Sequence, residues 1–253
     1  MRNMKKYLSF ILGVILIFSL SGCTSVPENT SPTVSTQQVE GNNDTTKAET
    51  KQKENAPAVD NSTSAIANVV VAGELKVNYI DVGQADSILI QQGSSSMLID
   101  AGNNEDSETV KNYISNKGIT KLDVVVGTHP HEDHIGGVDY IINSFQVGKI
   151  YMPKRTATTK TFKDVVNAIK NKGLKITAPT PGESFKLGEA TCTILAPNSS
   201  GYEDVNNESI VIKVTFGSNS FLFTGDAENV SENEMLSKGF NVSADLLKVG
   251  HHG

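Results

Sequence analysis

A dense histidine motif directly after a buried-strand pattern constrains this chain more than any other stretch. Three of its five histidines lie in Thr128–Gly137, T-H-P-H-E-D-H-I-G-G, together with two carboxylates. The run before it, Asp123–Gly127 (D-V-V-V-G), has three β-branched residues in a row, which predicts a buried strand that ends at the glycine. The histidines therefore stand on the loop that leaves a buried strand, where α/β folds usually build their sites.

The side chains of this motif are metal ligands by type and by spacing. Imidazole and carboxylate groups bind a borderline metal such as Zn²⁺. His129 and His131 can turn towards one ion, and the adjacent Asp133 and His134 can reach a second. The alternative is a polar surface loop with solvated side chains, but His and Asp are far denser here than chance predicts. We therefore predict one or two divalent ions, Zn or Mn.

The motif H-x-H-x-D-H-x-G-G resembles the metal-binding motif of the metallo-β-lactamase-like hydrolase superfamily. The resemblance implies an α/β fold, the αββα sandwich of that superfamily, with the metals at one edge. Four more segments resemble the metallo-hydrolase domain of ComEC-type competence proteins and their stand-alone relatives. They are N-Y-I-D-V-G-Q-A-D-S (78–87), L-I-D-A-G (98–102), N-N-E-S-I-V (206–211) and V-G-H-H-G (249–253).

The same resemblance implies a full set of site residues. Asp226, which follows the run F-L-F-T-G, matches the carboxylate that bridges two metals in the family, although an Asp there can also cap a helix. His251 and His252 leave open which one binds metal and which one positions substrate or protonates a leaving group; we favour His252 as the ligand. The implied metal ligands are His129, His131, Asp133, His134, Asp226 and His252, and the implied catalytic residues are Asp133 and His251.

Further polar residues resemble those that support the metal ligands in the family. Asp81, Asp86 and Asp100 stand at strand ends, and we expect them to orient the imidazoles, although each can instead cap a turn. No histidine lies between His134 and His251, so a usual third imidazole is missing. The segment 206–209, which includes Asn206 and Ser209, occupies about that region, and we expect more open coordination of the first metal.

The N-terminus carries the pattern of an exported lipoprotein. A basic start and an apolar run, Leu8–Leu20, predict a signal peptide over residues 1–22. The sequence L-S-G-C resembles the bacterial lipobox, which implies a lipid anchor on Cys23; an ordinary signal peptide or an anchor helix is the alternative. Residues 23–72 have no aromatic residue and predict a disordered tether. We expect the protein at the extracytoplasmic face of the bacterial cell membrane.

Residues 73–253 predict one hydrolase domain. Because relatives continue beyond the last histidine pair, we expect the sandwich to be truncated, without its C-terminal elements. The apolar patterns predict strands at residues 74–82, 86–91, 96–100, 123–127, 150–152, 174–178, 183–187, 190–195, 209–216, 220–224 and 245–249. They predict helices at residues 106–117, 136–143, 161–172 and 227–238.

One segment of this net-negative chain is strongly basic. Residues 145–178 carry eight Lys and Arg against Asp164 alone, whereas the formal net charge of the chain is −6. Such a segment favours a phosphate-binding face, and an ordinary solvated amphipathic helix is an equal alternative. The candidate substrate-binding residues are Lys154, Arg155, Lys160 and Lys163.

These observations predict a lipid-anchored, metal-dependent hydrolase in which metal-activated water attacks a phosphodiester. The expected substrate is DNA or another nucleic acid outside the cell. Hydrolysis of cell-envelope phosphodiesters, or a non-catalytic lipoprotein with a vestigial metal site, are the alternatives. No protein partner is evident from the sequence.

Overall fold

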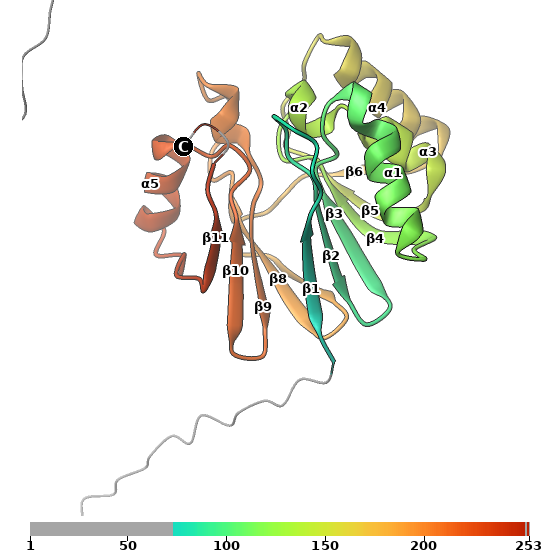
Figure 1. Ribbon diagram of the computed structural model, residues 1–253. Coiled ribbons are helices and arrows are strands. Elements are labelled where there is room, and N and C mark those ends of the chain that lie inside the picture. Colours follow the sequence, from blue (N-terminus) through green and yellow to red (C-terminus); the bar gives the residue numbers. More distant parts are fainter. Residues whose placement is uncertain (1–72, 251, 253) are drawn as a thin grey trace, which may run out of the picture. The chain divides into compact units, whose positions relative to one another are not determined.

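The computed structural model describes residues 73–250 and 252. The predicted signal peptide, Cys23, the tether and His251 lie outside the described residues. Two β-sheets face each other, with helices on the outer face of each (Figure 1). This arrangement is the predicted αββα sandwich, and the predicted fold class is confirmed.

The first sheet has six strands in the order β1-β2-β3-β4-β5-β6. Its first three strands pair antiparallel, and the pairs from β3 to β6 are parallel. The strands are β1 (Leu75–Tyr79), β2 (Ile88–Gln92), β3 (Ser95–Ile99), β4 (Lys121–Val126), β5 (Gln146–Tyr151) and β6 (Ile176–Thr177).

The second sheet has five strands in the order β11-β10-β9-β8-β7. All its pairs are antiparallel except β10 with β11, which is parallel. The strands are β7 (Ser184–Leu187), β8 (Ala190–Ala196), β9 (Val211–Phe216), β10 (Asn219–Phe223) and β11 (Leu246–Lys248).

Apolar stripes attach the helices to the sheets. In α4 the residues Val165, Ala168 and Ile169 are buried, and Thr159 caps the first turn by accepting from the Phe162 N–H. Figure 1 shows α1, α3 and α4 outside the first sheet and α5 outside the second. The helices are α1 (Ser107–Asn116), α2 (Glu132–Ile135), α3 (Val138–Ser144), α4 (Lys160–Asn171) and α5 (Asn229–Ser237), with 3₁₀ turns at Asn104–Asp106 and Val205–Glu208.

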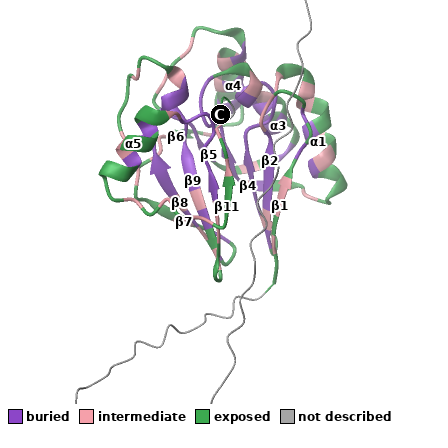
Figure 2. Cartoon of the chain, turned by 60° about the vertical axis from the view of Figure 1, so that its left-hand side comes forward, coloured by how far each residue is buried: buried purple, intermediate pink, exposed green. Residues whose placement is uncertain are grey.

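The buried apolar residues form three clusters between the sheets and helices. One apolar cluster joins the first sheet to its helices, a second fills the space between the sheets, and a third lies at α5. The central strands are therefore buried on both faces (Figure 2). Each fully buried Leu, Ile or Phe side chain contributes roughly 1.5–3 kcal/mol. Within the described part of the chain, no helix has the length and apolarity needed to cross a membrane.

The strand ends place the predicted site residues at one edge. Asp100 follows β3 and His129 follows β4, while Asp226 follows β10 and His252 follows β11. Because β3 and β4 are parallel, and β10 and β11 are parallel, each pair of carboxyl ends meets at the same side of its sheet. The two sheets thus bring four separate segments to one place.

Candidate metal centre

One carboxylate oxygen lies close to three imidazoles, two from the motif loop and one from the C-terminal segment. Asp226 Oδ2 lies 3.6 Å from His129 Nε2, 3.2 Å from His134 Nε2 and 3.2 Å from His252 Nε2. Asp226 is buried, whereas His252 is exposed. Imidazole nitrogens and a carboxylate oxygen are donor atoms that a divalent cation such as Zn²⁺ would bind.

His131 completes the first group of donors. Its Nδ1 lies 2.9 Å from His129 Nε2, and the two rings meet edge to face at 4.7 Å between centroids. Ligand atoms of His129, His131 and Asp226 all lie within 4.8 Å of one another. Two imidazole nitrogens and one carboxylate oxygen fit a borderline divalent cation, so this donor set is compatible with Zn²⁺ or Mn²⁺.

Asp100 fixes the orientation of both buried imidazoles. Its Oδ2 lies 2.8 Å from His134 Nδ1 and accepts from the Thr128 hydroxyl at 2.7 Å. The Thr128 oxygen in turn lies 3.1 Å from His129 Nδ1. With a proton on Nδ1 of each ring, the Nε2 atoms of both rings face Asp226. Asp100 has a left-handed backbone (φ 56°), which Asp tolerates better than most residues.

The buried charges shift the pKa values in opposite directions. Burial lowers the pKa of His129 to about 2, which keeps this ring neutral. Burial also lowers the pKa of His134, but the Asp100 and Asp226 carboxylates outweigh it and raise the pKa to about 10. Burial raises the pKa of Asp226, yet His134 and His129 bring it below its usual range. Without metal, the His134 imidazolium supplies the positive charge of this centre.

A second group of possible ligands, Asp86, Asp100 and His134 Nδ1, already has a cation beside it. The Lys248 ammonium donates to Asp86 Oδ2 and, at 2.9 Å, to the Gly225 carbonyl. Asp86 Oδ2 lies 3.9 Å from His134 Nδ1, and Asp100 is taken up by its hydrogen bonds. This group therefore orients His134, whose Nε2 faces Asp226.

The segment that stands where a third imidazole is expected is buried and ordered by hydrogen bonds. Ser209 Oγ lies 3.3 Å from His129 Nδ1 and accepts from the Asp226 N–H at 3.0 Å, so it links two predicted ligands. Asn206 Nδ2 donates to Glu228 Oε1 at 3.0 Å. The structure thus places Ser209 beside the centre and Asn206 at the neighbouring turn.

The remaining predicted acids lie at the rim. Asp133 Oδ2 is 3.8 Å from His134 Nε2, and its side chain is 29% exposed. Asp81 accepts from the Gly83 N–H at 3.3 Å, and no imidazole among the described residues is its partner. Both line a cavity of about 830 Å³ whose other acids are Glu105, Asp106 and Glu132. Asp81 is therefore placed as a turn cap, the alternative that the sequence left open.

The basic candidates are dispersed. Lys160 pairs with Asp164 at 2.5 Å and stands at the start of α4, which contacts α2. Arg155 lies 3.5 Å from the buried Glu208 and donates to the Tyr202 carbonyl, so its charge is already compensated. Lys154 lines a separate cavity with Glu208, and Lys163 is exposed on α4.

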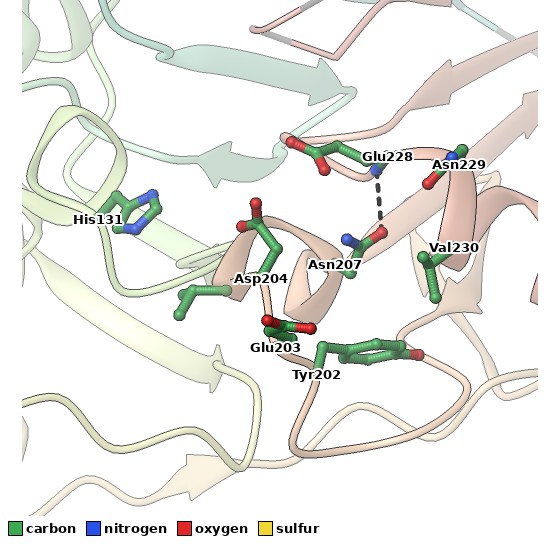
Figure 3. Close-up of a pocket in the computed structure, with 9 residues that line it drawn as sticks. His131, Tyr202, Glu203, Asp204, Asn207, Glu228, Asn229 and Val230 are labelled. Carbon is green, nitrogen blue, oxygen red and sulfur yellow. Dashed lines mark hydrogen bonds between the residues drawn. The ribbon is translucent and has the colours of Figure 1, made fainter.

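A further cavity of about 650 Å³ opens beside His131 (Figure 3). Its lining comes from the 202–207 segment and the start of α5, and includes Glu203, Asp204 and Glu228. The metal centre thus lies between two cavities with acidic walls.

Thr128, Lys248 and Asn207 have contacts that the sequence did not predict. Thr128 stands next to the first histidine of the motif, which is a usable signal. Lys248 contacts Asp86 across 162 residues of sequence, and Asn207 is buried in the wall of the cavity beside His131. The sequence around Lys248 or Asn207 contains no local pattern that would predict these contacts.

Comparison with known proteins identifies a family for most of the described chain. A family model described as the Metallo-beta-lactamase superfamily matches residues 80–253. ComE operon protein 3 of Bacillus subtilis (strain 168) is 29% identical over an alignment of 203 positions that covers 72% of this chain and 26% of that protein. Recombination protein 2 of Haemophilus influenzae is 28% identical over an alignment of 183 positions that covers 70% of this chain and 21% of that protein. The metallo-beta-lactamase fold protein YhfI of Bacillus subtilis has a TM-score of 0.42 at 21% identity, over 60% of this chain and 62% of that one.

Proposed function

Because the chain belongs to the metallo-β-lactamase superfamily, we propose that it is a metal-dependent hydrolase that cleaves phosphodiester bonds. The predicted relationship to ComEC-type proteins is confirmed by the two curated relatives. The chain spans about a quarter of their length, so the activity of those whole proteins does not transfer by itself. The observation that supports the proposal most is the convergence of three imidazole nitrogens on Asp226 Oδ2.

The residues of the centre divide the work. A bound divalent metal supplies an acidified water and neutralises the charge that develops on the phosphoryl oxygens. Asp226, His129 and His131 hold one end of the centre, and His134 and His252 hold the other. Asp100 keeps both buried imidazoles in the tautomer that presents Nε2. Asp133 stands partly exposed at the rim, where its carboxylate can accept a proton from the attacking water.

Nucleic acid is the substrate we propose first. The relationship to ComEC-type proteins and the exposed lysines Lys160 and Lys163 at the start of α4 support it. A second candidate, cell-envelope phosphodiesters, has its own support: both cavities beside the centre have acidic walls, which disfavour a polyanion passing through them.

We also propose that the domain is held at the extracytoplasmic membrane face by a lipid on Cys23. The lipobox-like sequence before Cys23 supports this proposal. A Cys23→Ser variant should release the protein from the membrane or leave its precursor uncleaved. A mature form of that variant that still needs detergent would contradict the proposal.

The test of the hydrolase proposal is metal analysis of purified protein, followed by assays on single-stranded DNA and on bis(para-nitrophenyl) phosphate. Asp226→Asn should lose most of the bound metal and both activities while the domain stays folded. Asp164→Asn, at an exposed ion pair on α4, is the matched control. Absence of stoichiometric Zn, Mn or Fe from natively purified protein would refute the hydrolase proposal.

A further inference from the structure

The cavity beside His131 has a wall that the hydrolytic centre does not use. Among the described residues that line it there is no Lys or Arg, whereas Glu203, Asp204 and Glu228 supply carboxylates. Tyr202 adds an aromatic ring, whose hydroxyl donates to Glu234 and so fixes the ring. Such a wall repels further phosphates and admits groups that donate hydrogen bonds.

Asn207 places one donor in this acidic wall. Its side chain is buried, with only 3% exposed, and its Oδ1 accepts from the backbone N–H groups of Glu228 at 3.3 Å and Ser231 at 3.0 Å. These bonds at the start of α5 turn the amide nitrogen away from the helix, towards the side where Asp204 and His131 lie (Figure 3). Within residues 73–250 and 252, Asn207 Nδ2 has no acceptor, so this largely buried residue presents an unused donor to the cavity that it lines.

Two carboxylates that line the cavity with Asn207 are each held in place by a hydrogen bond from Asn206. Asp204 Oδ1 accepts from the Asn206 N–H at 2.9 Å, and Glu228 Oε1 accepts from Asn206 Nδ2 at 3.0 Å. One oxygen of each carboxylate is thereby held, and the other is left for a ligand. The cavity thus presents one fixed donor between two fixed acceptors.

From this arrangement we infer that the cavity is a subsite for a polyhydroxylated group, a sugar ring or a polyol, attached to the scissile phosphodiester. A hydroxyl oxygen accepts from Asn207 Nδ2 while its hydrogen donates to Asp204 or Glu228. An ammonium group would pair with the carboxylates but leave the amide unsatisfied, and a phosphate would meet their repulsion. The position of the scissile bond rests on the proposed phosphodiester hydrolysis.

The test compares two para-nitrophenyl phosphodiesters, of glycerol and of propanol, which differ only in hydroxyl groups. The metal-loaded protein should prefer the glycerol diester in kcat/KM by about tenfold or more, since a site built for a hydroxyl rejects the analogue without it. Asn207→Asp keeps an acceptor for the N–H groups of α5 but loses the donor, and the preference should disappear. Asn229→Asp adds the same charge to the cavity, keeps the Asn207 donor and should keep the preference.

Direct binding separates this inference from the proposed reaction. Ligand-observed NMR with glycerol, ribitol, uridine and choline should show binding of the three polyhydroxylated probes but not of choline, and the Asn207→Asp substitution should abolish it. Such binding without hydrolysis of either diester would refute the proposed function and leave the subsite standing. Equal hydrolysis of both diesters by the unsubstituted protein, or binding of choline alone, would overturn the subsite. Uridine against ribitol distinguishes a ribose source from a polyol source.

Discussion

At the scale of single residues, the candidate metal centre depends on the buried carboxylate of Asp100, which lies on the Nδ1 side of the His134 ring, away from Asp226. Asp100 contacts His134 directly and reaches His129 through Thr128. Its backbone N–H and carbonyl contacts also tie β3 to its neighbours, since the Asp100 N–H donates to the Val126 carbonyl at 2.9 Å. The side chain of Asp100 therefore orients the imidazoles, while its backbone holds the edge of the sheet together.

Replacing Asp100 by Asn should weaken metal binding without unfolding the domain. Asn tolerates the left-handed backbone of this position, but it removes the anionic acceptor that holds His134 Nδ1. Loss of such an orienting carboxylate typically costs about 10–100-fold in metal affinity. Competition with a chelator of known affinity measures this change, and Asp164→Asn serves as the exposed control. Unchanged affinity would show that Asp100 does not orient the ligands.

His134 should make the metal-free domain sensitive to alkaline pH. Its pKa of about 10 in the folded state exceeds the ordinary value of 6.5. Its ion pairs therefore stabilise the domain fully below about pH 6.5, and that contribution is lost as the pH rises towards 10. A metal on Nε2 must displace the same proton, so loading near pH 8 should release about one proton. Thermal melts across this range and calorimetry in two buffers measure both effects; metal uptake with no proton release would contradict them.

Which site residues could be predicted depends on how far apart the partners lie in sequence. His129, His131 and His134 belong to one loop, so their spacing alone indicated a shared ion. Asp226 and Asp100 required the family resemblance, because nothing local distinguishes them from helix and turn caps. The contact of Lys248 with Asp86 arises only when the two sheets face each other. Such a contact has no signal in a single sequence.

At the scale of elements, close backbone approach explains the two glycines that end the motif. A Cβ on Gly136 would lie 2.3 Å from backbone atoms of Asn103 and Asn104. A Cβ on Gly137 would lie 2.5 Å from the Ala101 carbonyl oxygen. These contacts press α2 against the loop that follows β3, and so bring His134 within reach of Asp100.

Gly136→Ala should therefore damage both stability and the metal centre. The added methyl group has backbone on its near side, which cannot move aside as a flexible side chain can. Overpacking of this kind costs roughly 1–3 kcal/mol or more. Chemical denaturation measures the loss, with Gly118→Ala as a control at a position where a Cβ meets no atom but the positive φ alone adds strain. If the two variants lost equal stability, the close approach of the backbone would not explain why residue 136 is a glycine.

Element prediction succeeded where an apolar pattern was continuous and failed where it was interrupted. The buried strands β3, β8 and β10 lie within one or two residues of their predicted bounds. The strand β5 begins at Gln146, although only residues 150–152 were predicted, because its first half carries Gly148 and exposed polar residues. A Cβ at Gly148 would lie 2.5 Å from the Asp123 carbonyl oxygen, so the glycine allows β4 and β5 to pair closely.

At the scale of the whole domain, the two sheets supply different parts of the centre. The first sheet presents His129, His131 and His134 with the carboxylates that orient them, and the second presents Asp226 and His252. Only their face-to-face packing assembles the donor set. The family resemblance could therefore predict the fold class, whereas no local pattern could predict the distances within the site.

The proposed binding of nucleic acid by the start of α4 is the prediction that belongs to this scale. Each phosphate neutralised on a single strand contributes roughly 0.7 to the log–log slope of affinity against salt. Joint replacement of Lys160 and Lys163 by Ala should therefore lower that slope by about 1–2. Joint replacement of Lys170 and Lys175 by Ala is the control. These exposed residues lie in the last turn of α4 and just after it, so their replacement removes equal charge and should leave the slope nearly intact. An equal loss of slope in both double variants would show a diffuse effect of net charge, because only a localised contact depends on which pair of lysines is replaced.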